Sequence, residues 1–460
     1  MINLTLGELA QASGALLRGD PSVLVTGVST DSRTCTGGEL FVALPGERTD
    51  GHLHVADARD RGAVAVLGAR EVAGPALLSP DPLAALGRIA RAVLDRLANV
   101  AVTAVTGSSG KTGTKDLIGG LLARLGPTVA PAGSMNNEIG LPLTVLRCDT
   151  STRHLVLEMG ARGVGHIRYL CGIAPPQTAV VLNVGSAHLG EFGSRAAIAA
   201  AKAELVEGLA ATAVAVLNAD DPLVRAMAQR TAARVVLVGE SADAAVRAED
   251  VRLDTSGRAS FDLLTPSGSA EVRLRLVGEH HVANSLAAAA VACEQGMGVD
   301  AVAEALSRAE PVSRWRMEVR ERADGLVVVN DAYNANPESM RAALSTLAAM
   351  AGGRRTWAVL GEMRELGEAS ISEHDAIGRL AVRLGVDRLV AVGESARPIQ
   401  QGASLEGAGP GGAQWVPDVA EALRLLGAEA EAHDIVLVKA SRALGLERVA
   451  AGLLGEDVAT

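Results

Sequence analysis

The chain has 460 residues, of which 48% are apolar and only 2% are aromatic, and its formal net charge is −10. A chain of this length folds as about two to four domains, and we expect three. The negative charge argues against a nucleic-acid partner, because affinity for nucleic acid rests on basic patches that neutralise phosphates.

The cysteines and the first residues indicate where the protein works. Cys35, Cys148, Cys171 and Cys293 are scattered without the spacing of a metal site, which is typical of reduced cytosolic thiols. The N-terminus lacks the basic and apolar regions of a signal peptide, and no apolar run reaches the about 18 residues that span a membrane. We therefore expect a cytoplasmic protein without a membrane partner, and we expect it to act as a monomer.

Residues 1–98 mix short strand and helix patterns, which predicts a small α/β domain. Leu40–Leu44 has the pattern of a strand, and Arg88–Val100 has that of a helix leading to the next domain. The triplet Asp31, Ser32 and Arg33 places an acid, a hydroxyl and a guanidinium on a loop, where they could hold a polar ligand. An ordinary Asx turn explains the same three residues.

The most informative stretch follows at residues 101–113. Ala101–Thr106 is an apolar, β-branched run typical of a buried strand, and a helix pattern opens at Lys111. A strand, a glycine turn and a helix start direct backbone N–H groups at phosphate, while the lysine supplies charge and the next hydroxyl suits Mg²⁺. The turn, of the form G-x-x-G-K-T, consists of Gly107, Ser108, Ser109, Gly110, Lys111 and Thr112.

This loop departs from the usual phosphate-loop pattern GxxxxGK[ST], because Val105 stands where that pattern has its first glycine. A tight turn with a surface lysine is the alternative explanation. The strand before the loop and the helix after it favour a mononucleotide site, with ATP as the expected nucleotide.

Residues 99–313 alternate strand and helix signals, as a doubly wound parallel sheet does. The apolar strand His154–Met159 contains Glu158 near its end, and the strand Thr178–Val184 is soon followed by His188. Since the carboxyl ends of parallel strands gather ligand groups, Glu158 and His188 could hold Mg²⁺, although this cation prefers oxygen. Each residue alone could instead cap a helix.

Two further polar residues fall on helices of this region. The amide of Asn284, near the start of an alanine-rich helix, could bind a base edge or cap the helix. Lys202 belongs to the apolar stripe of the helix Arg195–Leu209, where a buried ammonium shifts toward its neutral form. Its stem could equally run along the helix to solvent. Lysine is rare in this chain, which favours a functional amine; the four lysines are Lys111, Lys115, Lys202 and Lys439.

Residues 314–460 have the pattern of a second parallel α/β unit. Asp331 ends its first strand and is followed by Asn334, and the glycine-rich stretch Gly402–Gly412 has the composition of a surface loop. The chain as a whole predicts an α/β protein of three domains: a small N-terminal α/β domain, a central parallel-sheet P-loop ATPase domain and a C-terminal Rossmann-like domain. The strands expected in the last unit are Leu326–Asn330, Thr356–Gly361, Arg388–Val392 and Ile435–Lys439.

These residues resemble the Mur ligase family of ATP-dependent amide-forming enzymes over essentially the whole chain. Within the family, Tyr333–Met340 resembles the branch that adds D-alanyl-D-alanine to a UDP-N-acetylmuramoyl-tripeptide. Two positions depart from the family pattern: Gly113 stands where a second hydroxyl is common, and Ala203 where glycine usually follows the lysine. The other matching segments are Thr106–Thr112, Asp31–Arg33 with Leu40–Leu44, Arg316–Glu318 and Ala201–Glu204.

The resemblance implies a reaction and a set of site residues. ATP would phosphorylate the tripeptide's terminal carboxylate, and the amine of D-alanyl-D-alanine would attack that acyl phosphate. Catalytic roles would fall to Lys111, Lys202, His188 and Glu158. Mg²⁺ would be held by Thr112, Glu158, His188 and Lys202 as a carbamate. ATP would be bound by Gly107–Thr112, Asn284, Arg316, Asp331 and Asn334. The UDP-sugar substrate would be bound by Asp31, Ser32, Arg33, Asn136 and Asn137.

Two other functions remain open at this point. One is a Mur-like ligase of another peptide-forming pathway. The other is a nucleotide-binding regulator that has kept the loop without the chemistry. The presence of Lys111, Glu158, His188 and Lys202 together argues against the second.

Overall fold

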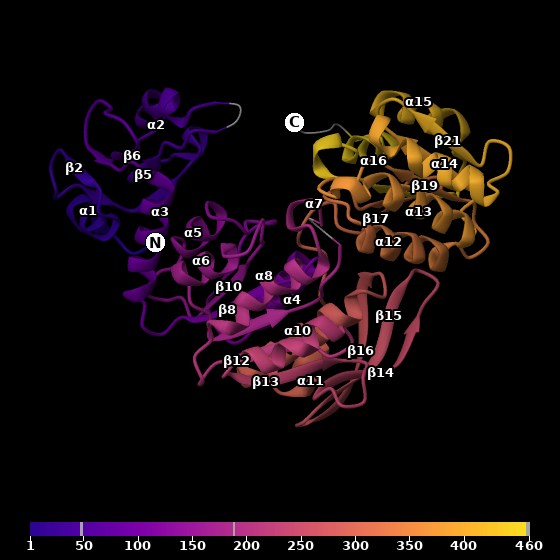
Figure 1. The fold of residues 1–460 in the computed structure, drawn as a ribbon, viewed down its shortest axis with the longest axis horizontal. Helices are drawn as coiled ribbons and strands as arrows, with labels where there is room; N and C mark the ends of the chain where they lie inside the picture. The colour runs from indigo at the N-terminus through magenta and orange to yellow at the C-terminus, as the bar shows by residue number, and fades with distance from the viewer. Residues whose placement is uncertain (47–48, 187–188, 457–460) are drawn as a thin grey trace.

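The computed structural model describes residues 1–46, 49–186 and 189–456, and it consists of three α/β units (Figure 1). The N-terminal and C-terminal units lie at the upper left and upper right of the view, and the central unit lies below them. Each unit contains its own main sheet, of five, nine and six strands, which confirms the expected α/β class. Among the helices described, none is both long and apolar enough to cross a membrane.

The N-terminal unit has a five-stranded sheet in the order β2-β7-β6-β5-β4, parallel except for β2. Its last helix, α3 (Pro82–Asp95), begins and ends earlier than the expected range Arg88–Val100. The Asp81 side chain caps it and Pro82 occupies its first turn, which fixes the earlier start. The remaining elements are β1 (Leu4–Thr5), α1 (Leu6–Ser13), β2 (Leu16–Arg18), β3 (Leu24–Val25), β4 (Gly27–Ser29), β5 (Glu39–Val42), α2 (Val55–Asp60), β6 (Ala65–Gly68) and β7 (Ala76–Leu78).

The central unit has a nine-stranded sheet in the order β16-β15-β14-β13-β12-β11-β8-β10-β9. The strands from β9 to β14 are parallel, and β14, β15 and β16 continue the sheet as an antiparallel meander. The strands are β8 (Ala101–Thr106), β9 (Thr128–Val129), β10 (His154–Glu158), β11 (Thr178–Val181), β12 (Val214–Asn218), β13 (Arg234–Gly239), β14 (Val246–Leu253), β15 (Arg258–Thr265) and β16 (Gly268–Val277). The helices are α4 (Lys111–Leu122), α5 (Gly140–Val145), α6 (His166–Ile173), α7 (Leu189–Phe192), α8 (Arg195–Glu207), α9 (Pro222–Arg225), α10 (His281–Glu294) and α11 (Val299–Ser307).

Helices cover both faces of the central sheet, and one face shares its core with the N-terminal unit. Leu86 and Ile89 of α3 belong to the same buried cluster as Leu141 and Val145 of α5. The opposite face is covered by α4, α10 and α11. Burial of this apolar area fixes the first two units against each other.

The C-terminal unit has a six-stranded sheet in the order β17-β18-β22-β19-β20-β21, parallel except at β17, with buried clusters on both faces. The strand β21 completes it and lies outside the four strands expected for this region. The elements are β17 (Glu318–Glu321), β18 (Val327–Asn330), α12 (Pro337–Met350), β19 (Thr356–Leu360), α13 (Ser370–Arg383), β20 (Arg388–Val392), α14 (Arg397–Glu406), β21 (Ala413–Val416), α15 (Val419–Glu429), β22 (Ile435–Lys439) and α16 (Glu447–Leu454).

The loop expected over Gly402–Gly412 is wrong for its first half, because α14 continues to Glu406. Gly402 lies where α14 meets α13, and a Cβ atom there would overlap the backbone of Asp375. Gly378 does the same in the opposite direction, against the backbone of Ile399. These glycines therefore allow two helices to approach closely, and they do not mark a loop.

Candidate active site

The glycine turn lies between β8 and α4, at the carboxyl edge of the central sheet. Gly110 has a φ of +79°, in the left-handed region, and a Cβ atom would lie 2.6 Å from Asn284 Oδ1, so both conformation and space require glycine. Among the described residues no side chain caps α4, which leaves its first N–H groups directed at the cavity described below. Lys111 Nζ donates to the carbonyl oxygen of Gly107 at 2.8 Å. Burial lowers the pKa of Lys111, and the charge of Glu158 partly offsets this.

Asn183, which the sequence analysis did not single out, contacts the same turn. Its Oδ1 accepts hydrogen bonds from the backbone nitrogens of Ser108 and Ser109, each at 2.9 Å. An oxygen atom therefore lies where a phosphate-binding turn places its donors. The signal in the sequence was a polar residue two positions after the strand β11 (Thr178–Val181).

Glu158 lies at the end of β10 and is 1% exposed. Its Oε2 accepts from Thr112 Oγ1 at 2.7 Å, and its Oε1 accepts from Ser134 Oγ at 2.8 Å and from Asn136 Nδ2 at 2.7 Å. The structure thus brings together three residues that were named from the sequence, and it adds Ser134. In the part of the chain that the structure describes, the Glu158 carboxylate accepts from side chains and caps no helix, so the capping explanation for this residue is wrong.

These oxygen atoms suit Mg²⁺, because a carboxylate and a threonine hydroxyl at the start of the phosphate-binding helix are ligands that this cation prefers. His188, the other expected ligand, lies outside the described residues. Among the residues that are described, no group of three His, Cys, Asp or Glu side chains lies close enough to hold a metal alone. The oxygen atoms of Thr112 and Glu158 therefore fit a metal that takes further oxygen ligands from a nucleotide or a modified side chain.

Lys202 is buried, with 4% of its surface exposed, between Ile198 and Leu205 on α8. The alternative in which its stem reaches solvent is therefore wrong. Burial lowers the pKa of Lys202 well below its ordinary value, and the nearby charge of Lys111 lowers it further. Burial thus shifts Lys202 toward the neutral amine, which is the form that reacts with CO₂.

Asp331, at the end of β18, organises the C-terminal side of the site. Its Oδ2 accepts from Lys439 Nζ at 2.6 Å, and its Oδ1 accepts from the backbone nitrogen of Met317 at 3.1 Å. Lys439 also donates to the carbonyl oxygen of Asn334 at 2.8 Å. The guanidinium of Arg316 stacks on the ring of Tyr333 at 4.1 Å.

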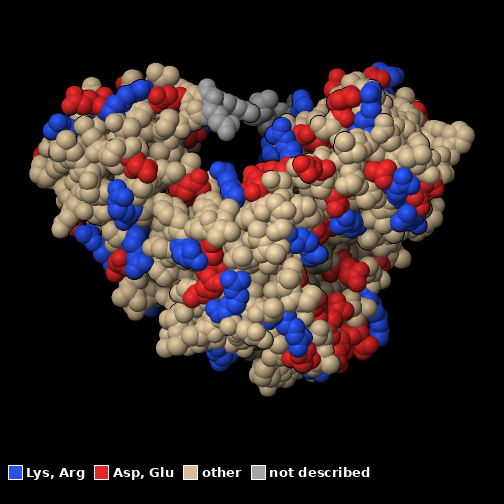
Figure 2. Space-filling view, viewed as in Figure 1, with Lys and Arg blue, Asp and Glu red and all other residues tan. Residues whose placement is uncertain are grey.

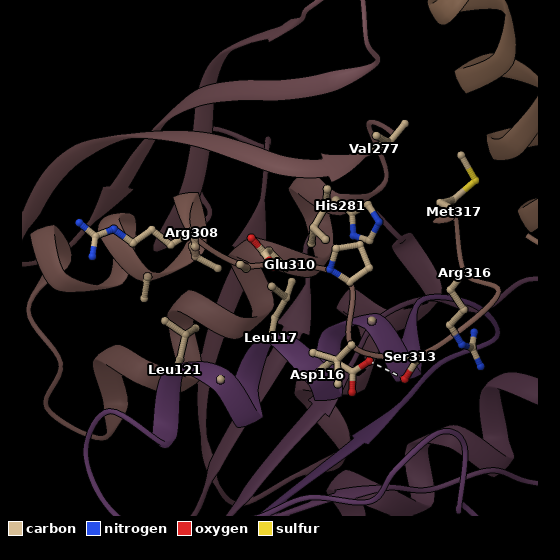
Figure 3. Close-up of a pocket in the computed structure, with 18 of the residues that line it drawn as sticks. Asp116, Leu117, Leu121, Val277, His281, Arg308, Glu310, Ser313, Arg316 and Met317 are labelled. Carbon is tan, nitrogen blue, oxygen red and sulfur yellow. Dashed lines mark hydrogen bonds between the residues drawn. The ribbon is translucent and has the colours of Figure 1, made fainter. Parts of the chain in front are cut away.

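The phosphate-binding turn, Glu158 and the groups around Asp331 line one cavity of about 330 Å³ between the central and C-terminal units. Asn284 lies inside α10 and faces this cavity, so it does not cap the helix. A second cavity of about 280 Å³ meets the first at His281 and Arg316 and extends over Leu117 and Leu121 of α4 (Figure 3). The site residues that line the first cavity are Ser108, Ser109, Gly110, Lys111, Thr112, Asn136, Glu158, Asn284, Arg316, Asp331 and Asn334.

Four of the residues expected to bind the substrate do not line this cavity, namely Asp31, Ser32 and Arg33 of the N-terminal unit and Asn137 of the central unit. Asp31 caps the short helix that contains Ser32, and hydrogen bonds from Arg33 lower the pKa of Asp31 to about 2. The Asx-turn explanation thus accounts for the local structure, while the Arg33 side chain remains largely exposed. Asn137 accepts from the backbone nitrogen of Gly140 at 2.9 Å, which is a local structural role. The molecule is hollowed between its N-terminal and C-terminal arms in the space-filling view (Figure 2).

Comparison with known proteins assigns all three units to one family. The sequence matches the Mur ligase family, catalytic domain, over residues 24–100, the Mur ligase middle domain over 105–292, and the Mur ligase, glutamate ligase domain over 315–442. It is 49% identical to the UDP-N-acetylmuramoyl-tripeptide--D-alanyl-D-alanine ligase of Mycobacterium tuberculosis, with 99% of each chain covered. The enzyme of the same name from Escherichia coli is 36% identical, with 98% of this chain and 99% of that protein covered.

Solved structures agree with this assignment. MurF from Acinetobacter baumannii has a TM-score of 0.89 at 33% identity, with 99% of each chain covered. MurF ligase from Thermotoga maritima, solved in complex with ADP, has a TM-score of 0.82 at 31% identity, with 94% of this chain and 98% of that chain covered. The chain belongs to the Mur ligase family.

Proposed function

We propose that this protein is an ATP-dependent ligase of peptidoglycan precursor synthesis, which adds D-alanyl-D-alanine to UDP-N-acetylmuramoyl-tripeptide. The observation that carries the proposal is the 49% identity over 99% of the chain to an enzyme named for this reaction. The site supports it, because a phosphate-binding turn and a buried carboxylate face residues of the C-terminal unit across one cavity.

The reaction follows from the chemistry of a carboxylate, which is a poor electrophile at neutral pH. A carboxylate oxygen of the tripeptide attacks the γ-phosphorus of ATP, the bond to the ADP oxygen breaks, and an acyl phosphate forms. The amine of D-alanyl-D-alanine then attacks the acyl carbon, a C–N bond forms, phosphate leaves, and the nitrogen loses a proton. Phosphoryl transfer depends mostly on positioning and charge neutralisation.

The residues of the turn provide both the positioning and the charge neutralisation. Backbone N–H groups of residues 107–112 bind the phosphates, and Lys111 neutralises the charge that develops on them. Lys111 would exchange its contact with Gly107 for a phosphate oxygen. Asn284, Arg316, Asp331 and Asn334 would hold the nucleoside from both sides of the cavity.

Mg²⁺ would be held by Thr112, Glu158, His188 and a carbamate on Lys202, and when bound it would neutralise phosphate charge. The fit of the oxygen atoms around Glu158 supports this. The burial of Lys202 supports the carbamate, since the neutral amine reacts with CO₂ to give an anion with two oxygens.

We further propose how the three units divide the work. Residues 1–98, with Asp31, Ser32 and Arg33, would bind the UDP-sugar, and Asn136 and Asn137 would contact the same substrate. Residues 99–313 would bind ATP, and residues 314–460 would close on it and bind the dipeptide. The protein would act as a cytoplasmic monomer on these small molecules, without nucleic acid or membrane.

An isotope experiment tests the acyl-phosphate step. Tripeptide labelled with ¹⁸O in its terminal carboxylate is incubated with ATP, D-alanyl-D-alanine and the protein, and the released phosphate is analysed by mass spectrometry. The proposal predicts that one labelled oxygen is transferred to each phosphate. Unlabelled phosphate with product formation would contradict the acyl phosphate. ATP binding without any ligation would favour a nucleotide-binding regulator.

A further inference from the structure

Lys115 is a buried lysine that has no part in the proposed reaction. It lies on α4, one turn after Lys111, and its side chain is 1% exposed. Its Nζ donates to the carbonyl oxygen of Pro131 at 2.7 Å and pairs with Asp116. A buried ion pair is weak evidence for stability, because apolar side chains of similar volume often serve as well. Its position therefore calls for another explanation.

The contact with Pro131 fixes one end of a segment that reaches the candidate metal ligand. Within Pro131–Asn136, Ser134 and Asn136 both donate to Glu158 Oε1, at 2.8 and 2.7 Å. The backbone oxygen of Asn136 accepts from the nitrogen of Gly160 at 2.9 Å, which fixes the other end of the segment next to β10. Two hydrogen bonds therefore connect Lys115 to the Glu158 carboxylate. One is from Lys115 to Pro131 and the other is from Ser134 to Glu158, and the backbone between Pro131 and Ser134 joins them.

Lys111 lines the same cavity as Glu158, and its ammonium is a cation that would compete with Mg²⁺ for the carboxylate. A carboxylate with one oxygen held by two fixed donors keeps its orientation, and its other oxygen faces the phosphate-binding helix at Thr112. If the segment Pro131–Asn136 were more mobile, the Glu158 carboxylate would turn toward the Lys111 ammonium. Mg²⁺ would then lose Glu158 as a ligand. Partners that orient metal ligands in this way typically change metal affinity by about 10–100-fold.

We propose that Lys115 is a positioning residue, which holds Glu158 in the orientation that binds Mg²⁺ by fixing the segment Pro131–Asn136. The inference rests on the proposed function only in that a metal–nucleotide complex binds at Glu158. It concerns the metal affinity of the site and does not depend on which peptide is ligated.

The test compares variants by calorimetry of ADP binding, in excess EDTA and over a series of Mg²⁺ concentrations. Lys115→Met combined with Asp116→Asn removes both charges together and keeps an acceptor for Ser313 Oγ, which Asp116 Oδ2 binds at 2.7 Å (Figure 3). Ser134→Ala removes one donor to Glu158. Thr128→Val is the matched control, because its hydroxyl binds only the nearby carbonyl oxygen of Gly126 in the contacts described.

We expect the Mg²⁺ concentration for half-maximal enhancement of ADP binding to rise about tenfold in the double variant and in Ser134→Ala. Binding of ADP in EDTA should stay within about twofold of the wild type in every variant, and Thr128→Val should match the wild type throughout. An equal loss of ADP binding with and without Mg²⁺ would assign Lys115 to folding and overturn the inference.

The remaining outcomes also decide the question. If the double variant does not melt cooperatively, Lys115→Arg replaces it, and we expect a smaller shift in the same direction because the longer side chain displaces Pro131. An unchanged Mg²⁺ midpoint in the folded Lys115 variant would overturn the inference while leaving the proposed function intact. A wild-type protein whose ADP binding ignores Mg²⁺ would instead contradict the proposed metal site itself.

Discussion

Glu338 of the C-terminal unit accepts two hydrogen bonds from Ser186 of the central unit, from the backbone nitrogen at 2.8 Å and from the hydroxyl at 2.9 Å. Both bonds end on Oε1, while the buried Oε2 has no hydrogen-bond partner among the residues that the structure describes. Asn336, at the start of the same helix, donates to the backbone oxygen of Ser108 in the phosphate-binding turn. The N-terminus of α12 therefore holds the two units together at the candidate site.

Glu338→Ala should shift the nucleotide-free protein toward more open arrangements. Hydrogen bonds to a charged group contribute about 1.5–3 kcal/mol each to stability, and the partial exposure of Glu338 reduces this contribution. We expect a larger radius of gyration by small-angle X-ray scattering and a fall of about tenfold in kcat/KM for ATP. Glu421→Ala, on the surface of α15, is the control. An unchanged scattering profile would mean that this contact does not hold the units together.

Lys111→Met should abolish turnover and leave the fold intact, because Lys111 lies at a helix start facing the cavity and not in a core cluster. Loss of a charge that stabilises the transferring phosphoryl group should cost about 3 kcal/mol or more, which is over a hundredfold in kcat. Steady-state kinetics and circular dichroism measure the two effects. Near-normal turnover in a folded variant would remove the phosphate-loop assignment.

Lys202→Ala should be nearly inactive, and short carboxylic acids should restore part of its activity by supplying the missing anion. The physical reason is that burial favours the neutral amine, from which a carbamate forms. Activity is measured with and without added acetate or propionate. Lys202→Arg provides the comparison, since a guanidinium at the same place should respond to neither acid. Full activity in Lys202→Ala would end the carbamate proposal.

His374 should make the stability of the C-terminal unit depend on pH. Its Nε2 accepts from the backbone nitrogen of Met363 at 2.8 Å, and burial lowers the pKa of its imidazole below 6.5. The unfolded chain therefore binds a proton before the folded protein does, and stability is lost as the pH falls from 6.5 through the lower folded-state value. Urea unfolding at pH 7.5 and 5.5 should show this loss in the wild type and a smaller loss in His374→Gln. Equal losses in both proteins would contradict it.

The sequence predicted well what depends on neighbouring residues. The strand Ala101–Thr106, the turn and the helix start at Lys111 lie where the pattern placed them, and Lys202 is buried in the stripe that its spacing indicated. These features follow from local periodicity and from glycine, which act within a few residues.

Contacts between distant segments could not be predicted in the same way. Ser134, Asn183 and Glu338 reach the site only because separate loops and separate units meet there. Gly402 suggested a loop, whereas its purpose is close packing against α13, which a single sequence does not reveal. Hydrogen bonds across tens to hundreds of residues carry no pattern in one chain.

The most direct test of the central claim is phosphate release with defined substrates. The purified protein is incubated with ATP, UDP-N-acetylmuramoyl-tripeptide and D-alanyl-D-alanine, and then with each of the three left out in turn. D-alanine or diaminopimelate replaces the dipeptide in parallel reactions. The account predicts one phosphate per pentapeptide formed, only in the complete mixture, and much slower turnover with either substitute. Equal rates with free D-alanine or diaminopimelate, or no ligation in the complete mixture, would contradict it.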